Sequence, residues 1–496
     1  MGQCQPLYID AMFFRQFYDQ PLAQASYLLG CQQTGEAIVV DPNRDIAQYI
    51  DVAAAEGLQI THVTETHIHA DFVSGVRELA SATRARMFLS AEGGPEWQYR
   101  FAEAGGATLI HDGDAIMVGN IRLTAMHSPG HTPEHLAFIV DDTPRAAGAM
   151  GVLTGDFVFV GDVGRPDLLE RAAGYADTME AGARTLFRSL ERFRALPDHL
   201  QVWPGHGAGS ACGKSLGAVP SSTVGYEKRS NWGVAETDES AFVANVLDGQ
   251  PEPPRYFAEM KRINREGPPI LHRMPTPAEL SADTIIDLAE ETWLIDLRPT
   301  EASAMAHIPG ALTIAYGKSF ATFAGTVVPY DVDTVLVTSA TDASALTEVG
   351  VPSRVLHAAH DLAMIGLDRI RGWIAAESAL SAWHKSGHKG ASTVQVSVDE
   401  FDQWPAAPMT IVDVRGEGEW REGHLPNALH VPLGSLVQRM GEIPDGPVLF
   451  QCQGGSRSAI AASLFKRFGR PDARNFAGGF DAWRAVHRLK EALNAP

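Results

Sequence analysis

The sequence is poor in cysteine and in long apolar runs, and each shortage excludes a class of protein. Its 496 residues include only four cysteines, Cys4, Cys31, Cys212 and Cys452, which form no CxxC pair. A disulfide framework is therefore excluded, and we expect a reducing, cytoplasmic compartment in which a special cysteine is special for its reactivity. No run of about 18 apolar residues occurs, so no membrane-spanning helix is expected.

Basic charge is also scarce, because 40 Lys and Arg residues stand against 60 Asp and Glu, a formal net charge of −20. An acidic surface repels phosphate backbones, so no nucleic-acid partner is expected. The N-terminal stretch MGQCQPLYIDAMFF lacks the basic and apolar segments of a signal peptide, and we expect no membrane association. A hydrophobic fraction of 45% excludes wholesale disorder. At roughly 150 residues per domain, the length predicts about three domains.

The N-terminal half alternates short predicted strands with helices. Strands are expected at 37–40, 60–65, 121–127 and within 151–162, from their short apolar, β-branched runs. Each of the last three is followed by a loop rich in His, Asp or Gly. Ligands gather on loops at strand ends in folds of this class, so these loops indicate one convergent site.

Histidine and aspartate side chains supply that predicted site. In THIHADF, at 66–72, alternation along an extended backbone places three of them on one side of the loop. One such histidine alone is usually structural, but a set at successive strand ends indicates a metal site. The set consists of His67, His69, Asp71, His131, Asp156 and His206.

The set resembles the metallo-β-lactamase fold, whose members carry an HxHxDH motif, a later histidine, a bridging aspartate and a final histidine. The resemblance covers residues 8–250 and implies an α/β fold with an αββα sandwich. Phe72 replaces the last histidine of the motif. A second metal would need that imidazole, so Phe72 argues against a dinuclear zinc site like that of the hydrolytic members.

Persulfide dioxygenases of the same superfamily use the positions of His67, His131 and Asp156 as iron ligands. Two imidazoles and one carboxylate form the facial set that leaves open positions on iron(II), although ligand chemistry alone does not separate iron from zinc. By the same resemblance, the remaining members of the set orient these ligands or hold bound water. These are His69, Asp71 and His206.

Three further residues are candidates for substrate binding. Arg165, in GRPD, could pair with the carboxylate of a thiol such as glutathione, or equally form a salt bridge within its loop. The Gly-rich stretch 205–218 contains Cys212 and Lys214. This stretch could hold an anion or present a thiol near the metal, and Cys212 could equally be packed as a small hydrophobe.

The C-terminal half contains an internal repeat. LIDLRPTEASAMAHIPGAL, at 294–312, matches IVDVRGEGEWREGHLPNAL, at 411–429, in its Asp-x-Arg and His-[IL]-Pro turns. A stretch rich in Pro and charge precedes it and predicts a linker. We therefore expect four segments: a metal-binding domain at 1–255, a linker at 256–276, and two homologous domains at 277–385 and 394–496.

Cys452 lies between a predicted strand and a predicted helix. A helix N-terminus favours a thiolate, Gly454 and Gly455 let the loop curl, and Arg457 can stabilise an anionic sulfur species. The loop resembles the rhodanese active site, and GGFDAW at 478–483 matches that family too. Four residues separate Cys452 from Arg457, whereas related phosphatases have five. In the first repeat Ser339 and Ser344 occupy these two positions, so that repeat is expected to be inactive.

The whole arrangement resembles the multidomain persulfide dioxygenase–sulfurtransferase family: a metallo-β-lactamase-like domain followed by two rhodanese-like α/β domains. The resemblance implies one Fe(II) per chain, a thiol persulfide of glutathione or coenzyme A type, O2 and sulfite as partners, and a homo-oligomer. The enzyme would oxidise the persulfide to sulfite and transfer sulfane sulfur through Cys452 to give thiosulfate. Two alternatives stay open: a thioester hydrolase of glyoxalase II type, and a sulfur carrier or sensor whose metal is structural.

Overall fold

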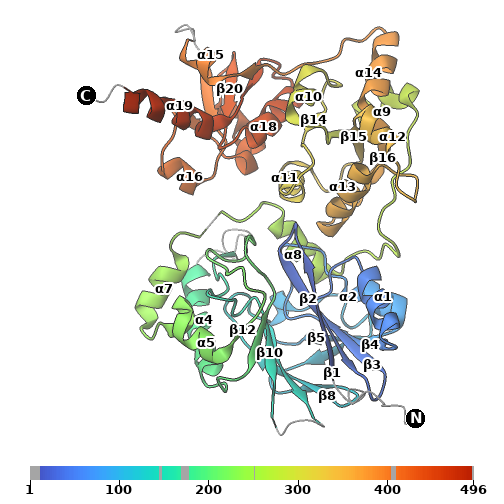
Figure 1. Cartoon of the computed structure of the whole chain (residues 1–496), viewed down its shortest axis with the longest axis vertical. Coiled ribbons are helices and arrows are strands. Elements are labelled where there is room, and N and C mark those ends of the chain that lie inside the picture. The colour runs from blue at the N-terminus through green and yellow to red at the C-terminus, as the bar shows by residue number, and fades with distance from the viewer. Residues whose placement is uncertain (1–11, 144–147, 169–177, 251, 404–408, 494–496) are drawn as a thin grey trace, which may run out of the picture. The chain divides into compact units, whose positions relative to one another are not determined.

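The computed structural model describes residues 12–143, 148–168, 178–250, 252–403 and 409–493 (Figure 1). Cys4 lies outside the described residues. The chain divides into two compact units, Met1–Met274 and Pro275–Pro496. Among the described helices, none combines the length and the apolar character that a membrane crossing requires.

The first unit is built on two six-stranded sheets. One has the order β1-β2-β3-β4-β5-β6, with β1 Met12–Asp19, β2 Gln24–Cys31, β3 Glu36–Val40, β4 Gln59–Thr64, β5 Arg86–Ser90 and β6 Thr108–Ile110. The other has the order β12-β11-β10-β9-β8-β7, with β7 Ala115–Val118, β8 Ile121–His127, β9 Leu136–Asp142, β10 Gly151–Gly155, β11 Gln201–Pro204 and β12 Ser222–Thr223.

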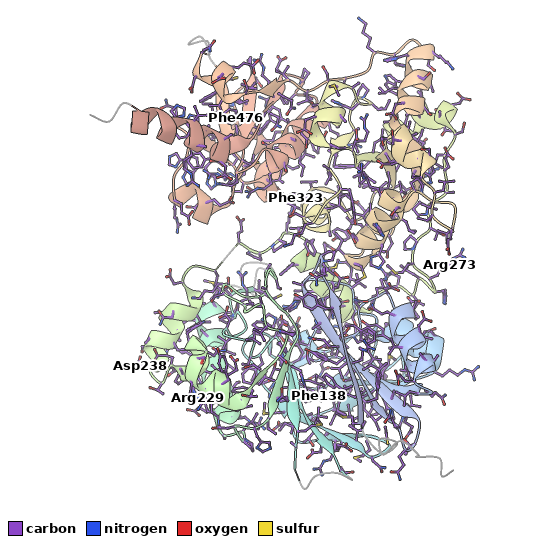
Figure 2. All side chains as sticks on the ribbon, in the orientation of Figure 1. Phe138, Arg229, Asp238, Arg273, Phe323 and Phe476 are labelled. Atoms are coloured by element: carbon purple, nitrogen blue, oxygen red, sulfur yellow. The ribbon has the colours of Figure 1, made fainter. Side chains whose placement is uncertain are left out.

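Alternation along the strands gives each sheet two buried faces. In β3, Ile38 packs into a core shared with Phe138 of the second sheet, a residue labelled in Figure 2. Its neighbour Val39 packs with the helices on the outer face. The outer face of the first sheet is covered by α1 (Ala47–Ala55) and α2 (Val76–Thr83). The outer face of the second is covered by α4 (Met179–Arg194) and α7 (Glu239–Leu247), with α5 (Val224–Ser230) and α6 (Trp232–Ala235) nearby. The predicted αββα sandwich is confirmed.

The stretch expected to be a linker is in large part a piece of the first unit. It contains α8 (Phe257–Glu266), which buries Phe257, Met260 and Asn264. These positions lie on one face of a helix, and the surrounding Pro and charged residues concealed that face in the sequence. Beyond the helix, Arg44 donates a hydrogen bond of 2.7 Å to the carbonyl of Pro269.

The second unit contains two parallel sheets whose strand orders match. The four-stranded sheet has the order β14-β13-β15-β16 and the five-stranded sheet has the order β17-β21-β20-β18-β19. Read from its other edge, the larger sheet begins β19-β18-β20-β21, so the internal repeat folds with one topology. The strands are β13 Trp293–Asp296, β14 Leu312–Thr313, β15 Thr334–Thr338, β16 Ile370–Ala375, β17 Gln395–Val396, β18 Thr410–Asp413, β19 Leu429–His430, β20 Val448–Gln451 and β21 Ala473–Phe476.

The Asp-x-Arg turn also recurs as one structure in both sheets. The Arg298–Asp296 and Arg415–Asp413 pairs are buried ion pairs, each with an N–O distance of 2.7 Å. The helices of this unit are α9 Ile285–Glu291, α10 Thr300–Met305, α11 Phe320–Val327, α12 Ala340–Ser344, α13 Ser353–Met364, α14 Ala376–Lys385, α15 Val398–Asp402, α16 Glu417–Arg421, α17 Leu436–Arg439, α18 Ser456–Arg467 and α19 Gly479–Leu493.

Candidate metal centre and sulfur-transfer loop

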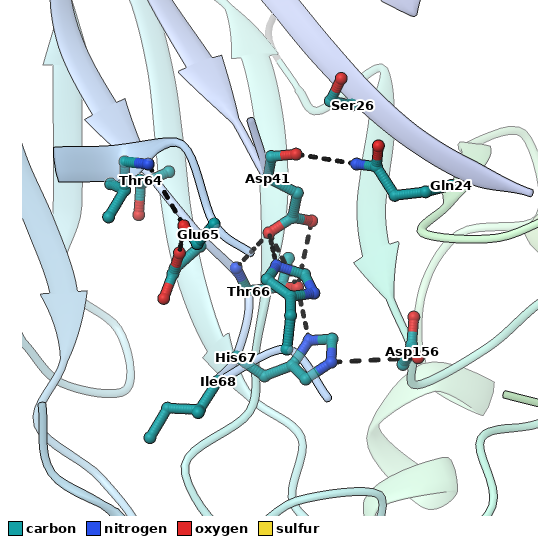
Figure 3. Close-up of polar contacts among 12 residues, drawn as sticks. Gln24, Ser26, Asp41, Thr64, Glu65, Thr66, His67, Ile68 and Asp156 are labelled. Atoms are coloured by element: carbon teal, nitrogen blue, oxygen red, sulfur yellow. Dashed lines mark hydrogen bonds and ion pairs between the residues drawn. The ribbon is translucent and has the colours of Figure 1, made fainter. Parts of the chain in front are cut away.

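His67, His131 and Asp156 meet at one end of the two sheets of the first unit. His67 follows β4, His131 lies between β8 and β9, and Asp156 directly follows β10. One ligand-type atom of each lies within 4.8 Å of the others, and all three side chains are buried. Asp156 Oδ2 is 3.9 Å from His67 Nε2 (Figure 3). The same oxygen is 3.5 Å from His131 Nε2.

Both imidazoles are held with their Nε2 atoms free to bind a cation. The carbonyl of Arg165 lies 3.1 Å from His131 Nδ1, and a carbonyl can only accept, so Nδ1 carries the proton. The Thr66 hydroxyl donates to Asp41 and lies 2.9 Å from His67 Nδ1, which must therefore donate to it (Figure 3). In each ring the lone pair then sits on Nε2, toward Asp156.

The charge of this group fits a divalent cation. Neither carboxylate oxygen of Asp156 accepts a hydrogen bond from a described residue, and the side chain is 1% exposed. Burying an unpaired carboxylate costs several kcal/mol, which a bound cation would offset. Burial lowers the pKa of His67 and of His131 below the usual value, which keeps both rings neutral as ligands. Two imidazoles and a carboxylate leave further coordination positions open.

A second polar group lies against the other oxygen of Asp156. His206 Nε2 is 3.5 Å from Asp156 Oδ1 and 3.2 Å from Asp71 Oδ2. Cys212 belongs to this group too. One ligand-type atom each of Asp71, His206 and Cys212 lies within 4.8 Å of the others. Phe72, which stands where the HxHxDH motif has its last histidine, is fully buried with its ring 4.4 Å from the ring of His69. A phenyl ring offers no ligand atom, so His206 is the one imidazole of this group.

His69 has a different environment from the other histidines of the set. Its Nε2 lies 3.1 Å from Asp41 Oδ1. Burial alone would lower the pKa of His69, but the hydrogen bond with Asp41 raises it to about 9. His69 is thus held as a cation beside Asp41, whose carboxylate also fixes Thr66. Asp41 directly follows β3, and no local signal in the sequence marked it as a support of this loop.

Several residues that hold the backbone around the candidate ligands, at 67–74 and at Asp156, were not predicted. Glu134 Oε1 accepts a hydrogen bond of 2.8 Å from the amide of Ile68. Asn264, on α8, donates to the carbonyls of His69 and Phe72 over 2.8 and 2.7 Å. His135 accepts a hydrogen bond from the amide of Asp156. Glu134 and His135 lie in the stretch SPGHTPEH, at 128–135, beside His131. That closeness in sequence was the one signal that could have indicated them.

Two interpretations were open for Arg165, a contact with the carboxylate of a substrate and a salt bridge within its loop, and the structure shows the second contact. Its guanidinium is fully buried and pairs with Asp167 through two hydrogen bonds of 2.9 and 2.7 Å. A third hydrogen bond, of 2.8 Å, goes to the carbonyl of Ala211. The alternative interpretation, a salt bridge within the loop, describes this residue. Its bearing on the site is indirect, because its carbonyl holds His131.

Lys214 also differs from the expectation of an anion-binding residue. Its ammonium donates to the carbonyls of Asn245 and Asp248 at the end of α7, and it lies 4.7 Å from the centre of the Trp232 ring. Carbonyls at a helix C-terminus are a favourable place for a cation, so Lys214 stabilises that helix end.

Cys212 is 2% exposed, and burial, with the nearby carboxylates of Asp156 and Asp71, raises the pKa of its thiol well above the usual value. It is therefore a buried, protonated thiol beside the candidate metal centre.

In the second unit, Cys452 lies in a tight loop between β20 and α18. Its Sγ accepts a hydrogen bond of 3.1 Å from the amide of Gly455 and one of 3.3 Å from the Ser458 hydroxyl. Gly455 has a φ of 98°, a conformation that favours glycine, so the curl of the loop depends on this residue. The sulfur is thus held by neutral donors at the start of a helix.

Arg457 reaches a carboxylate that the sequence did not indicate. Its Nη1 and Nη2 donate hydrogen bonds of 2.6 and 2.7 Å to the two oxygens of Glu419, on α16. In the first repeat, the aligned Ser339 instead begins α12, where its hydroxyl accepts from the amide of Asp342. That loop contains neither the thiol nor the guanidinium of the second one.

Comparisons with known proteins match both parts of the chain. The family model described as metallo-beta-lactamase superfamily matches residues 19–206, and the rhodanese-like domain model matches residues 397–486. The mitochondrial persulfide dioxygenase ETHE1 of Homo sapiens is 30% identical over 200 residues, covering 39% of this chain and 68% of that protein. A hydroxyacylglutathione hydrolase of Rhodopseudomonas palustris is 28% identical over 242 residues, covering 48% of this chain and 80% of the hydrolase.

A solved structure extends the match beyond the metal-binding unit. The crystal structure of a metallo-beta-lactamase from Staphylococcus aureus has 42% sequence identity and a TM-score of 0.64. It covers 74% of this chain and 99% of that one. The likeness therefore includes part of the second unit.

Proposed function

This chain belongs to the metallo-β-lactamase superfamily and carries a rhodanese-like domain, and we propose that it is an enzyme of sulfur metabolism that oxidises low-molecular-weight thiol persulfides with O2 to sulfite. We further propose that Cys452 transfers sulfane sulfur to sulfite, giving thiosulfate. Residues 1–255, together with the following helix α8 of the same unit, would form the dioxygenase part, and 394–496 the sulfurtransferase part. Residues 277–385 would form the inactive rhodanese-like part.

The observation that carries this proposal is that His67, His131 and Asp156 come together in the interior. The carboxylate of Asp156 accepts no hydrogen bond from any described residue. This donor set would hold one iron(II), which supplies open positions for O2 and for the outer sulfur of a persulfide. Thr66 and the carbonyl of Arg165 orient the two imidazoles before any metal arrives. Similarity to a persulfide dioxygenase supports iron as the metal and a persulfide as the substrate.

Asp71 and His206 are placed to take part in proton transfer. A persulfide RSSH loses a proton when its sulfur binds as an anion, and a nearby base must accept that proton. Burial raises the pKa of Asp71, which brings its carboxylate toward the range of an effective base. Asp71 Oδ2 accepts the proton in this scheme. His206 Nδ1 donates to the carbonyl of Ala23, so the lone pair of Nε2 faces Asp71 Oδ2 at 3.2 Å and can accept a hydrogen bond from the protonated carboxyl.

The second step uses the Cys452 loop. The Cys452 thiolate attacks the outer sulfur of RSSH, forms a Cys452 persulfide and releases RSH after proton transfer to the leaving thiolate. Sulfite then attacks the outer sulfur of the Cys452 persulfide, which gives thiosulfate and restores the thiolate. The donors on Cys452 Sγ, Gly455 and Ser458, stabilise the anion at each stage.

A thioester hydrolase remains the second candidate, because a hydroxyacylglutathione hydrolase is among the similar proteins. That chemistry needs two metals in the superfamily pattern, and Phe72 leaves the second polar group with a single imidazole. The glutathione-type or coenzyme A-type carrier and a homo-oligomeric state are part of the proposal, each open to measurement.

The deciding experiment is oxygen uptake by the iron-reconstituted full chain with glutathione persulfide and with coenzyme A persulfide. We expect O2 consumption with at least one of them, sulfite as the first product, and thiosulfate when persulfide is in excess. Two zinc ions per chain, no oxygen uptake and hydrolysis of a lactoylglutathione thioester would overturn the proposal in favour of the hydrolase.

A further inference from the structure

Glu419 and Arg457 form a bidentate ion pair beside the Cys452 loop. Both guanidinium nitrogens Nη1 and Nη2 are engaged, at 2.6 and 2.7 Å. The two side chains are 24% exposed for Arg457 and 35% exposed for Glu419, so solvent and small anions reach the pair. The cation expected to stabilise anionic sulfur is therefore already occupied by a carboxylate.

Glu419 is itself held in place by its helix. Its Oε2 accepts a hydrogen bond of 3.2 Å from the amide of Gly416, at the start of α16. Partial burial opposes its ionisation, but the hydrogen bonds from Arg457 lower the pKa of Glu419 below the usual value. The carboxylate is thus a fixed negative charge in the resting loop.

A second guanidinium near the loop, that of Arg415, already has hydrogen-bond partners within the protein. Arg415 pairs with Asp413 and donates to the side chain of Gln453 and to the carbonyl of Gly423. Arg415 is 2% exposed and Arg457 is 24% exposed, so of these two guanidinium groups Arg457 is the one that can turn to a partner from solvent. It can do so only by releasing Glu419.

Sulfur donors differ in whether their binding requires Arg457 to leave Glu419 and contact the donor instead. The anionic outer sulfur of a thiol persulfide fits the donors already on Cys452, namely the amide of Gly455 and the hydroxyl of Ser458. Thiosulfate carries an additional sulfonate group whose oxygens match a guanidinium fork. To bind it, Arg457 must release Glu419, whose charge also repels the incoming dianion.

We propose that Glu419 is a positioning residue that sets the donor specificity of the Cys452 loop: by holding Arg457, it favours thiol persulfides over thiosulfate as the sulfur donor. The inference rests on the proposed sulfurtransferase function. In the disfavoured reaction, the Cys452 thiolate takes the outer sulfur of thiosulfate to form a Cys452 persulfide anion, and sulfite leaves with the bonding electron pair. Sulfite as acceptor requires the same exchange of partner by Arg457.

The test compares two donors with one acceptor in the full chain. Transfer to cyanide is measured with thiosulfate and with glutathione persulfide for the wild type and for Glu419→Gln. Gln keeps the hydrogen-bond acceptor for Gly416 and suits this helix position, so the fold is expected to persist. We expect KM for thiosulfate to fall about tenfold, as loss of one opposing charge predicts, and kcat/KM for the persulfide to change less than about twofold.

Two further variants separate specificity from general effects of charge. Glu417→Gln removes a charge from the same helix, but Glu417 pairs with Arg421 and His430 rather than with Arg457, and we expect both donors to be unaffected. Glu419→Asp keeps the carboxylate and should stay close to the wild type. An equal gain in Glu417→Gln, an unchanged KM for thiosulfate in Glu419→Gln, or an equal loss with both donors would overturn the inference. A wild type that transfers sulfur from neither donor would instead refute the proposed function.

Discussion

The side-chain amide of Asn264 donates a hydrogen bond of 2.8 Å to the backbone carbonyl of His69, a residue 195 positions earlier in the chain. The same amide donates to the carbonyl of Phe72, and its Oδ1 accepts from the amide of Ser74. One buried side chain of α8 therefore holds three backbone groups of the loop that carries the metal-binding motif. Helix α8 is thus a structural part of the candidate metal centre.

Replacing Asn264 by Ala should loosen this loop. Two carbonyls and one amide would lose their partner in a buried place, so we expect the free energy of unfolding to fall by about 2 kcal/mol or more. Iron should also dissociate faster, because His67 lies in the loosened loop. Thermal unfolding and iron content after gel filtration measure the two effects.

A matched control is Asn245→Ala, which changes the same residue type at an exposed position of α7. A helix tolerates this change with little loss of stability. If Asn264→Ala retains wild-type iron content and stability, the clamp by α8 does not matter to the site.

Replacing Asp156 by Ala should remove the metal without touching the sulfur-transfer loop. The cluster would keep two imidazoles and lose its buried anionic ligand. We expect loss of iron and of persulfide-dependent O2 uptake, while sulfur transfer to cyanide continues. Iron content is measured by elemental analysis.

The wild type offers a second measurement of the same assignment. Added iron(II) should raise its thermal unfolding midpoint, since a ligand that binds only the folded state stabilises it. The Asp156→Ala variant should show no such rise, and full iron occupancy in that variant would contradict the assignment of Asp156 as a ligand.

Replacing Cys452 by Ser should separate the two proposed activities. The hydroxyl keeps the size of the side chain but cannot carry sulfane sulfur. We expect thiosulfate formation to be abolished, while O2 uptake and sulfite formation stay close to the wild type. Sulfite and thiosulfate are quantified after reaction with a thiol-labelling reagent and chromatography.

Cys31→Ser is the control for the loss of a buried cysteine at another place, because Cys31 ends β2 in the other unit. Disappearance of O2 uptake in Cys452→Ser would show that the proposed oxidation depends on the sulfur-transfer loop, contrary to the two-site scheme.

Replacing Phe72 by His tests why one metal is expected. The change would restore the HxHxDH pattern, and the resemblance to the two-metal hydrolases implies that the new imidazole would serve as a ligand of the second metal. We expect zinc content to rise toward two per chain, at a cost of about 2 kcal/mol or more in stability because a fully buried ring becomes polar. Zinc is counted by elemental analysis after dialysis, and Phe72→Tyr serves as the non-ligating control.

Local patterns in the sequence were sufficient for the main features of the fold and the candidate site. The strand periodicity and the His and Asp residues at strand ends depend on neighbours a few positions away, so His67 and Asp71 could be read from one short stretch. The loop of Cys452 is equally local, since its glycine, its hydroxyl and the following helix all lie within six residues. The repeat likewise predicted matching strand orders for the two sheets of the second unit.

The partners of charged side chains were decided only by the tertiary structure. Arg165 and Lys214 were candidates for substrate binding, yet each is engaged by groups of the protein itself, and Arg457 pairs with a carboxylate 38 residues earlier in the chain. A side chain's partner depends on which distant segments pack beside it, and that information does not reside in the residues around it. For the same reason Asn264, in a stretch rich in Pro and charge, was recognisable as a support of the loop at 67–74 only once its contacts with that loop were seen.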